Sequence, residues 1–275
     1  MEVVTRLLVA LADRYTLERE IGRGGWAMVF LARRAVTDSW VAVKVLRPEF
    51  ARLLGAHRFH REIALLARLN HPNVLPLTES GQAGDLPYYV MPYAAAGSLR
   101  DRLEREPQLP LADVVTIVQE VAAALDYAHA NHIVHRDIKP DNVLFMDGRA
   151  VVSDFGIARA MDEAGGERLS SSGLVAGTPE YMSPEQAAGQ RDLDGRTDIY
   201  GLGCMTYEML AGCPPFCGAT LQAIVARRAH APPPLRVVRP DVPEHVEQAI
   251  LAALARRPED RPWNGAGLVE SLVRV

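Results

Sequence analysis

Two short stretches decide how this sequence is interpreted: His135-Arg-Asp-Ile-Lys-Pro-Asp-Asn142 and, further on, Ser153-Asp-Phe-Gly156. The first combines a carboxylate, a lysine and a side-chain amide, between a helical pattern and a strand pair. Its carboxylate, Asp137, can accept a hydroxyl proton. Oxygens such as those of Asn142 and Asp154 are ligands that Mg²⁺ prefers. Together these groups indicate phosphoryl-transfer chemistry rather than an ordinary polar loop.

A glycine-rich stretch, Gly22-Arg-Gly-Gly-Trp-Ala-Met-Val29, lies upstream between two strand patterns. Glycines let backbone N–H groups approach phosphates without a side-chain clash. A second strand follows, whereas a dinucleotide-binding fold would place a helix there. The motif alone is also compatible with a purely structural hairpin.

Lys44 lies in the apolar strand pattern Val41–Leu46. A buried ammonium needs an anionic partner. Glu62, at the border of the apolar stripe of the next helical pattern, can supply it. The alternative is a surface lysine whose stem lies along apolar surface while its charge stays in water.

Lysine is rare in this chain. Lys44 and Lys139 are the only lysines among 30 Lys and Arg residues. An arginine-biased composition could leave two lysines by chance, or the two positions could have been kept for a chemical reason.

Hydrophobic patterning divides the chain into a β-rich part and an α-rich part that meet near residue 92. Strands are expected at 15–21, 28–33, 40–46, 74–79, 88–91, 143–146 and 150–153. Helices are expected at 3–13, 56–69, 99–106, 111–131, 184–188, 198–210, 221–228, 246–255 and 266–274.

Composition excludes several classes of protein. The 275 residues are 48% hydrophobic and 23% charged, which is typical of globular proteins and not of disordered or fibrous ones. The net charge of −4 argues against nucleic-acid binding. The chain lacks an apolar run long enough to span a membrane. Its three cysteines suggest no disulfide framework, so a cytoplasmic setting is expected.

These motifs, with Ser183-Pro-Glu185, resemble in content and order the signature set of the protein kinase family, most closely its bacterial serine/threonine branch. The resemblance covers about residues 13–272. It implies an α+β, bilobal protein-kinase-like fold, with a small β-rich lobe and a larger α-rich lobe. The implied boundaries are a helical extension over 1–14 and a catalytic domain over 15–272. That domain divides into an N-lobe at 15–91, a hinge at 92–97 and a C-lobe at 98–272.

The resemblance also implies roles for individual residues. Asp137 would accept the hydroxyl proton, Lys139 would contact the γ-phosphate, and Lys44 would pair with Glu62 and bind the α- and β-phosphates. Asn142 and Asp154 would hold Mg²⁺, or alternatively Mn²⁺. The implied ATP-binding residues are Ile21, Gly22, Gly24, Gly25, Val29, Ala42, Lys44, Met91, Tyr93, Ala94 and Leu144.

Other positions acquire structural or regulatory roles from the same resemblance. Thr178 would belong to the platform for a substrate peptide, Glu185 and Arg261 would form a structural ion pair, and Asp198 would brace the catalytic loop. Arg136 would bind a phosphate on the activation loop. The candidate phosphosites are Ser170, Ser171 and Ser172.

The chain departs from the family pattern in the glycine-rich loop and in the hinge. Ala27 replaces a glycine, and Pro92 stands where an acid is usual. Trp26, at the loop tip, is expected to cover the phosphates or to pack on the helix.

The expected function is ATP-dependent phosphorylation of serine and threonine hydroxyls on proteins, including autophosphorylation. A pseudokinase acting as an ATP-binding scaffold is one alternative, but the catalytic groups Lys44, Asp137, Asn142 and Asp154 are all present. A small-molecule phosphotransferase is another, but the segments that build a peptide platform are present too. Expected partners are protein substrates and ATP, with no nucleic acid. A homodimer through the N-lobe, and membership of a longer membrane-anchored protein, are further possibilities.

Overall fold

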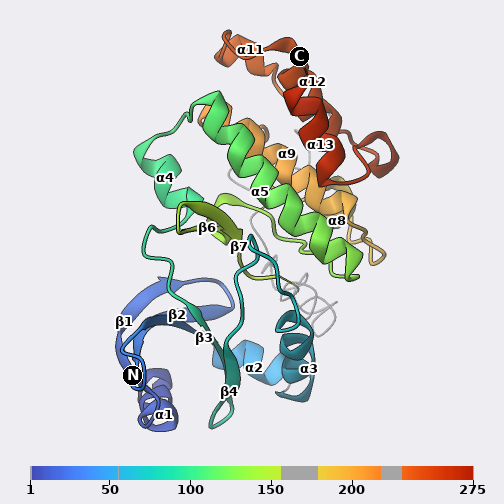
Figure 1. Ribbon diagram of the computed structural model, residues 1–275. Coiled ribbons are helices and arrows are strands. Elements are labelled where there is room, and N and C mark those ends of the chain that lie inside the picture. Colours follow the sequence, from blue (N-terminus) through green and yellow to red (C-terminus); the bar gives the residue numbers. More distant parts are fainter. Residues whose placement is uncertain (1, 55, 156–178, 218–230, 275) are drawn as a thin grey trace. The chain divides into compact units, whose positions relative to one another are not determined.

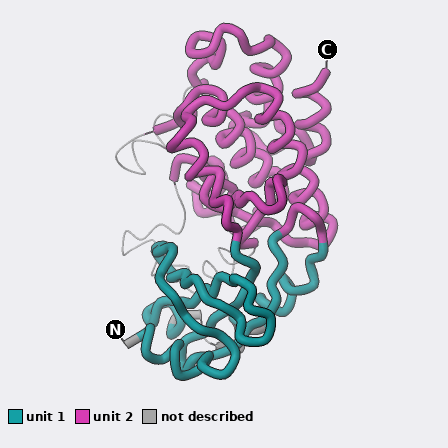
Figure 2. Tube along the Cα trace, turned by 60° about the vertical axis from the view of Figure 1, so that its left-hand side comes forward, with its two compact units in different colours: residues 1–70, 75–93, 159–176 teal, residues 71–74, 94–158, 177–275 magenta. Residues whose placement is uncertain are grey.

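The computed structural model describes residues 2–54, 56–155, 179–217 and 231–274, without the side chains of 2, 53, 54, 56–58, 60 and 62. The chain divides into two compact units, shown in different colours in Figure 2. Among the described residues, unit 1 contains 2–54, 56–70 and 75–93, and unit 2 contains 71–74, 94–155, 179–217 and 231–274.

Unit 1 is built on an antiparallel sheet with the strand order β1-β2-β3-β5-β4 (Figure 1). The strands are β1 (Tyr15–Arg23), β2 (Ala27–Arg34), β3 (Trp40–Leu46), β4 (Glu79–Ala83) and β5 (Leu86–Pro92). Nearly every residue of the central strands β3 and β5 is buried. That burial explains why their sequences are mainly apolar, with Lys44 as the one charged residue, rather than alternating.

Three helices accompany this sheet: α1 (Glu2–Leu11), α2 (Pro48–Leu54) and α3 (Ala56–Leu66). Helix α1 lies against β1 and β4 and buries Leu7 and Leu11 completely. Helix α2 was not expected from the hydrophobic pattern. Its signal is Pro48 at the first helical position followed by Glu49 in the first turn, a typical helix start.

The expected strand at 74–79 was wrong. Strand β4 begins at Glu79, and Val74 makes only an isolated bridge to Val152 inside unit 2. Pro76 explains the difference, because it has no N–H to give to a sheet. The true strand was missed because it is mostly polar. Its Gly81 is needed because a Cβ there would lie 2.5 Å from the hydroxyl oxygen of Tyr88.

Unit 2 is mainly helical and carries one short hairpin. Its helices are α4 (Leu99–Arg105), α5 (Leu111–Ala130), α8 (Pro184–Ala187), α9 (Arg196–Ala211), α11 (Leu235–Val238), α12 (Glu244–Ala253) and α13 (Gly265–Val273). The 3₁₀ turns η1 (Pro140–Asn142) and η2 (Pro258–Asp260) and the antiparallel pair β6 (Val143–Met146) and β7 (Arg149–Val152) complete it. Helix α9 is buried along almost its whole length, so its polar residues need partners inside the unit.

Two glycines allow the helices of unit 2 to approach closely. A Cβ on Gly265 of α13 would lie 2.7 Å from the Cβ of Ala122 on α5. A Cβ on Gly203 of α9 would lie 2.9 Å from that of Ala253 on α12. Both distances are shorter than van der Waals contact, so these crossings depend on the missing side chains.

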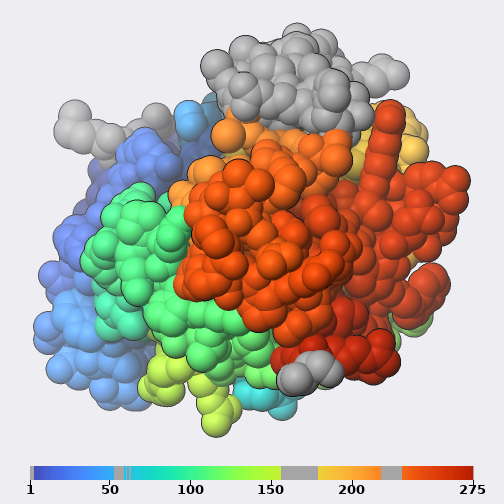
Figure 3. Space-filling model, turned by 90° about the horizontal axis from the view of Figure 1, so that it is seen from above, coloured from blue at the N-terminus to red at the C-terminus, as the bar shows by residue number. Residues whose placement is uncertain are grey.

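Helix α11 is a single turn that the hydrophobic pattern did not indicate. With α12 it forms the orange surface in the middle of Figure 3. The side chain of Leu235, the first residue of α11, is buried. Arg239, directly after the helix, donates from its side chain to the carbonyl of Leu109 at 2.6 Å. A buried leucine and one arginine therefore hold a segment whose Val237 and Val238 are exposed.

The start of α13 is capped from another helix. Asp126 of α5 accepts hydrogen bonds from the backbone N–H groups of Gly265 at 2.7 Å and Ala266 at 2.9 Å. Both would otherwise be unsatisfied donors at a helix N-terminus, where a negative charge is also favourable.

We expect Asp126→Ala to lower the free energy of unfolding by about 1–2 kcal/mol, because both donors lose their acceptor. Urea unfolding followed by circular dichroism measures the change. Asp126→Asn keeps one acceptor oxygen but loses the charge. Its free energy of unfolding should therefore lie between those of the wild type and Asp126→Ala. An unchanged unfolding midpoint in Asp126→Ala would show that the cap contributes nothing.

Candidate active site

Two polar side chains of unit 2, those of Lys139 and Asn142, meet at the carboxylate of Asp137. Lys139 Nζ lies 2.8 Å from Asp137 Oδ2, and Asn142 Nδ2 lies 3.0 Å from the same oxygen. Asn142 Nδ2 also donates to the backbone carbonyl of Asp137 at 2.7 Å. Both contacts to the carboxylate use Oδ2, so they fix its orientation while Oδ1 takes part in neither. The loop thus holds a proton acceptor beside a cation.

A buried carboxylate of α9 holds the backbone of this loop. Asp198 Oδ1 accepts from the N–H of Arg136 at 2.7 Å, and Oδ2 accepts from the N–H of His135 at 2.8 Å. Oδ2 also lies 2.8 Å from His129 Nε2. Burial by itself would raise the pKa of Asp198, but the hydrogen bond and the charge of His129 keep that pKa below its ordinary value. The bracing role expected for Asp198 thus has a direct geometric basis.

The ring of His135 connects the loop to the segment that carries Asp154. Its Nε2 lies 2.8 Å from the carbonyl oxygen of Ser153, and the N–H of Asp137 donates to its Nδ1 at 3.2 Å. A carbonyl oxygen can only accept, so the proton of this tautomer is on Nε2. The ring of Phe155 meets His135 edge to face at 4.7 Å between centroids. Asp154 is therefore positioned between two residues that both contact His135.

Two residues of this site have a left-handed backbone. Arg136 has φ +69° and Asp154 has φ +64°. A non-glycine residue in this region is uncommon, costs on the order of 1–3 kcal/mol, and occurs at functional sites and in turns. Sequence spacing alone could not reveal this feature, because both side chains are ordinary in type.

In unit 1, Lys44 lies on β3 opposite Val29 of β2 and Tyr89 of β5. The residue is 8% exposed, and Nζ lies 4.4 Å from the centroid of the Trp26 ring. The sequence led us to expect Trp26 over the phosphates or on the helix, whereas its indole stacks on Lys44. Glu62 lies on α3, but its side chain is outside the described part, so the Lys44–Glu62 pair stays a prediction.

The remaining expected ATP-binding residues fall on several elements of both units. Those in unit 1 are Ile21 and Gly22 on β1, Gly24 and Gly25 before β2, Val29 on β2, Ala42 on β3, Met91 on β5 and Tyr93 after it. Ala94 and Leu144, the latter on β6, belong to unit 2. Pro92 ends β5 in register with Val41, a strand end where proline is tolerated.

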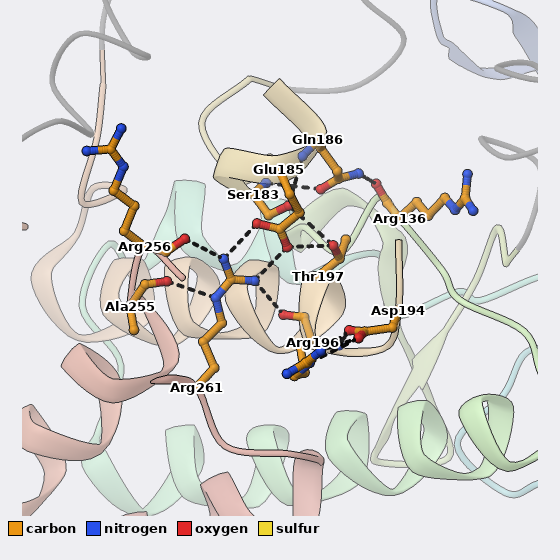
Figure 4. Close-up of polar contacts among 10 residues, drawn as sticks. All are labelled: Arg136, Ser183, Glu185, Gln186, Asp194, Arg196, Thr197, Ala255, Arg256 and Arg261. Atoms are coloured by element: carbon orange, nitrogen blue, oxygen red, sulfur yellow. Dashed lines mark hydrogen bonds and ion pairs between the residues drawn. The ribbon is translucent and has the colours of Figure 1, made fainter. Parts of the chain in front are cut away.

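The expected ion pair between Glu185 and Arg261 is present and bidentate (Figure 4). Arg261 Nη1 and Nη2 each lie 2.7 Å from a different carboxylate oxygen of Glu185. The hydroxyl of Thr197 donates to Glu185 at 2.8 Å. Burial alone would raise the pKa of Glu185, but Arg261 keeps it below its ordinary value. The pair joins α8 to the segment after η2.

Sequence reasoning missed a second buried cluster, formed by Arg100, Tyr181 and Glu208. Arg100 Nη1 lies 2.8 Å from Glu208 Oε1, and Arg100 Nη2 donates to the hydroxyl of Tyr181 at 2.6 Å. That hydroxyl donates to Glu208 Oε2 at 2.5 Å. Burial and Glu208 together raise the pKa of Tyr181. The cluster connects α4, α9 and the residues beside the expected substrate platform.

Several expected residues lie outside the described part of the chain. They are the phosphosite candidates Ser170, Ser171 and Ser172, the platform residue Thr178, Gly156, and the helix at 221–228. Their roles stay predictions.

The His129–Asp198 pair predicts a pH-dependent contribution to stability. Burial alone would lower the pKa of His129, but the hydrogen bond to Asp198 and the charges of Asp198, Asp126 and Asp194 raise it above 6.5. A raised folded-state pKa gives stabilisation that is complete below pH 6.5 and is lost as the pH rises through the folded value.

We therefore compare the wild type with His129→Gln by urea unfolding over about pH 5 to 9. The difference in unfolding free energy should be largest at the acidic end and should shrink as the pH rises. A difference that is constant, or that grows with pH, would contradict the charged pair.

Comparison with known proteins agrees with this geometry. A model of the protein kinase domain matches residues 15–263. The chain therefore belongs to the protein kinase family, and the α+β class expected from the sequence is confirmed by a five-stranded unit and a helical unit.

Three curated relatives are bacterial proteins named as serine/threonine-protein kinases. Serine/threonine-protein kinase PknB of Mycolicibacterium smegmatis is 39% identical over 274 residues, covering 96% of this chain and 43% of the relative. PknB of Mycobacterium tuberculosis is 38% identical over 272 residues, covering 96% and 43%. Serine/threonine-protein kinase pkn3 of Myxococcus xanthus is 39% identical over 279 residues, covering 96% and 50%.

The chain thus spans about half the length of these curated relatives, or somewhat less. Within the described residues, no helix is long and apolar enough to cross a membrane.

Proposed function

We propose that this chain is an active protein kinase that transfers the γ-phosphoryl group of ATP to serine and threonine hydroxyls of proteins. The carrying observation is the arrangement at Asp137, where Lys139 Nζ and Asn142 Nδ2 both contact one carboxylate oxygen. A scaffold without activity would not need an oriented acceptor beside a cation.

Asp137 would orient the substrate hydroxyl and accept its proton as the phosphoryl group leaves ATP. Lys139, 2.8 Å away and still partly exposed, can exchange this carboxylate for the transferring phosphate. The transition state is loose and gains most from positioning and charge stabilisation. Lys44 would orient the α- and β-phosphates from unit 1.

The residues of unit 2 fit a hard divalent cation, and we propose Mg²⁺. Asn142 uses its Nδ2 for Asp137, so the oxygen is the remaining polar atom of its amide. Asp154 offers a carboxylate from a strained backbone, and both donors are oxygens, which Mg²⁺ prefers. When bound, the ion would neutralise charge on the ATP phosphates.

We also propose that Arg136 binds a phosphate on Ser170, Ser171 or Ser172. Among the described residues, Arg136 Nε is buried without a hydrogen-bond partner. A buried guanidinium nitrogen without an acceptor suits an anion that arrives later. Mass spectrometry of the segment 168–178 after incubation with Mg-ATP tests this regulation. No phosphate there would exclude it.

A cytoplasmic setting belongs to the same proposal. Cys204, Cys213 and Cys217 are all free thiols, which suits a reducing compartment.

The test of the function is transfer of label from γ-labelled ATP to peptides that differ only at the acceptor residue, serine, threonine or tyrosine. We expect label on the serine and threonine peptides, none on the tyrosine peptide, and loss of transfer with a chelator. Lys44→Met should lose most of the transfer, because the phosphates are no longer positioned. Label on none of the peptides and none on the chain itself would overturn the proposal.

A further inference from the structure

The tip of the glycine-rich loop is held against the end of β3. The N–H of Gly24 donates to the carbonyl of Ala27 at 2.9 Å, which leaves Gly25 and Trp26 at the turn. Arg47, the residue after β3, donates from its backbone to the carbonyl of Trp26 at 3.0 Å. Its side chain donates to the carbonyl of Gly25 at 3.0 Å. The tip is thus fastened at two points by one residue.

This anchoring places the Trp26 indole over the ammonium of Lys44. The ring centroid lies 4.4 Å from Nζ, well within the range of a cation–π interaction. Lys44 is only 8% exposed, and the indole is one of the groups that cover it. A phosphate that binds this ammonium on the face covered by the indole would have to displace the ring.

The tip is not forced into this position by packing of its glycines. A Cβ on Gly25 would meet no described atom within 4 Å, and one on Gly24 would meet only the carbonyl of Ala27 at 3.7 Å. The tip contacts its surroundings through the hydrogen bonds from Arg47 and the stacking of the indole on Lys44. All of these groups belong to unit 1, and an indole can leave an ammonium without unfolding a strand.

We propose that Trp26 is an internal competitor for the phosphates of the nucleotide: its ring occupies Lys44 when the site is empty and must be displaced by the phosphates when ATP binds. This inference rests on the proposed function, in which Lys44 binds phosphate. Trp26 then lowers the affinity for nucleotides, because its cation–π contact with Lys44 must be broken when ATP binds.

The direction in which Trp26→Leu changes the Kd for ATP shows whether the Trp26 ring competes with the phosphates or helps to bind them. If the ring competes, Trp26→Leu removes the aromatic face, keeps apolar bulk, and should bind ATP more tightly. The expected change in Kd is about 2- to 30-fold, the range that corresponds to a cation–π interaction at a partly desolvated site. Adenosine, which has no phosphates, should bind both proteins equally.

Trp40 provides a matched control in the same sheet. Its ring also stacks on a cation, because the guanidinium carbon of Arg33 lies 4.6 Å from the ring centroid. Trp40 is, however, not part of the glycine-rich stretch at 22–29. Trp40→Leu should leave the Kd for ATP unchanged. This control separates loss of the Trp26–Lys44 contact from a general loss of aromatic packing in unit 1.

The measurement is isothermal titration calorimetry with Mg-ATP and with adenosine on the wild type, Trp26→Leu and Trp40→Leu. The chain has three tryptophans, so replacing Trp40 and Trp263 with phenylalanine leaves Trp26 as the single indole, and its emission should change saturably with ATP. Weaker or unchanged ATP binding in Trp26→Leu, or an equal gain for adenosine, would overturn the proposal. Absence of ATP binding in folded wild-type and variant proteins would instead overturn the proposed function.

Discussion

Asp137→Asn is expected to lower kcat for phosphoryl transfer by about 10²- to 10⁴-fold, the usual contribution of a positioned general base. The substitution is nearly isosteric, and Lys139 and Asn142 can still donate to the remaining carbonyl oxygen of the side chain. What is lost is the negative charge and the ability to accept the hydroxyl proton. Because the loop geometry survives, the loss should appear in kcat and not in the Kd for ATP.

The experiment measures kcat at saturating ATP and peptide, with the Kd for ATP measured separately. Asp147→Asn is the matched control, since it makes the same chemical change in the exposed turn between β6 and β7. Asp147 has φ +51°, a conformation that asparagine also tolerates. The control should keep the wild-type rate. Wild-type kcat in Asp137→Asn would remove Asp137 from the proposed role.

Arg261→Met is expected to cost about 3–5 kcal/mol of folding free energy, because it leaves the carboxylate of Glu185 buried without its counter-charge. The Arg261 side chain is fully buried and that of Glu185 is 7% exposed. Arg261 also donates to the carbonyls of Ala255 at 2.8 Å and Arg196 at 2.9 Å, and these lose their donor too. A loss of this size is a large share of the stability of a typical domain.

Urea unfolding of the wild type, Arg261→Met and Arg257→Met tests the size of this effect. Arg257 pairs with Glu259 and Asp260 on the surface and is 67% exposed, so its removal should cost less than about 1 kcal/mol. If both substitutions lowered the free energy of unfolding by a similar amount, the buried Glu185–Arg261 pair would contribute no more than a surface ion pair. If Arg261→Met does not fold, the variant Arg261→Lys, which keeps the charge, should recover part of the stability.

The contribution of the Glu185 pair also depends on pH. The folded-state pKa of Glu185 is lowered, so its stabilisation is present above the ordinary value of 4.5 and is lost as the pH falls through the folded value. The wild type should therefore approach Arg261→Met in stability only under acid conditions.

The sequence was sufficient to predict the parts of the candidate site whose residues are close together in the chain. The loop around Asp137 is contiguous, so the meeting of Asp137, Lys139 and Asn142 could be predicted from spacing. The mainly apolar runs of β3 and β5 were equally clear. Strand β4 could not be predicted, because its residues are polar and it owes its place to pairing with β5.

The cluster of Arg100, Tyr181 and Glu208 shows what spacing cannot reveal. Its members come from three distant segments, and each is an ordinary polar residue in its own neighbourhood. Only the burial of α9 requires that Glu208 find partners. The stacking of Trp26 on Lys44 is similar, because it depends on how Arg47 turns the loop tip.

Asp198 has a consequence for how such a domain can evolve. Two of its hydrogen bonds go to backbone N–H groups, those of His135 and Arg136, and a backbone N–H is present in any residue except proline. The position of Asp137 is therefore uncoupled from the side chain of its neighbour Arg136. If Arg136 has the proposed phosphate-binding role, exchanging its side chain would change that role and leave both backbone hydrogen bonds to Asp198 available. On the proposed roles, the residue for control and the residue for chemistry are neighbours in the sequence, yet the side chain of the first can change independently of the second.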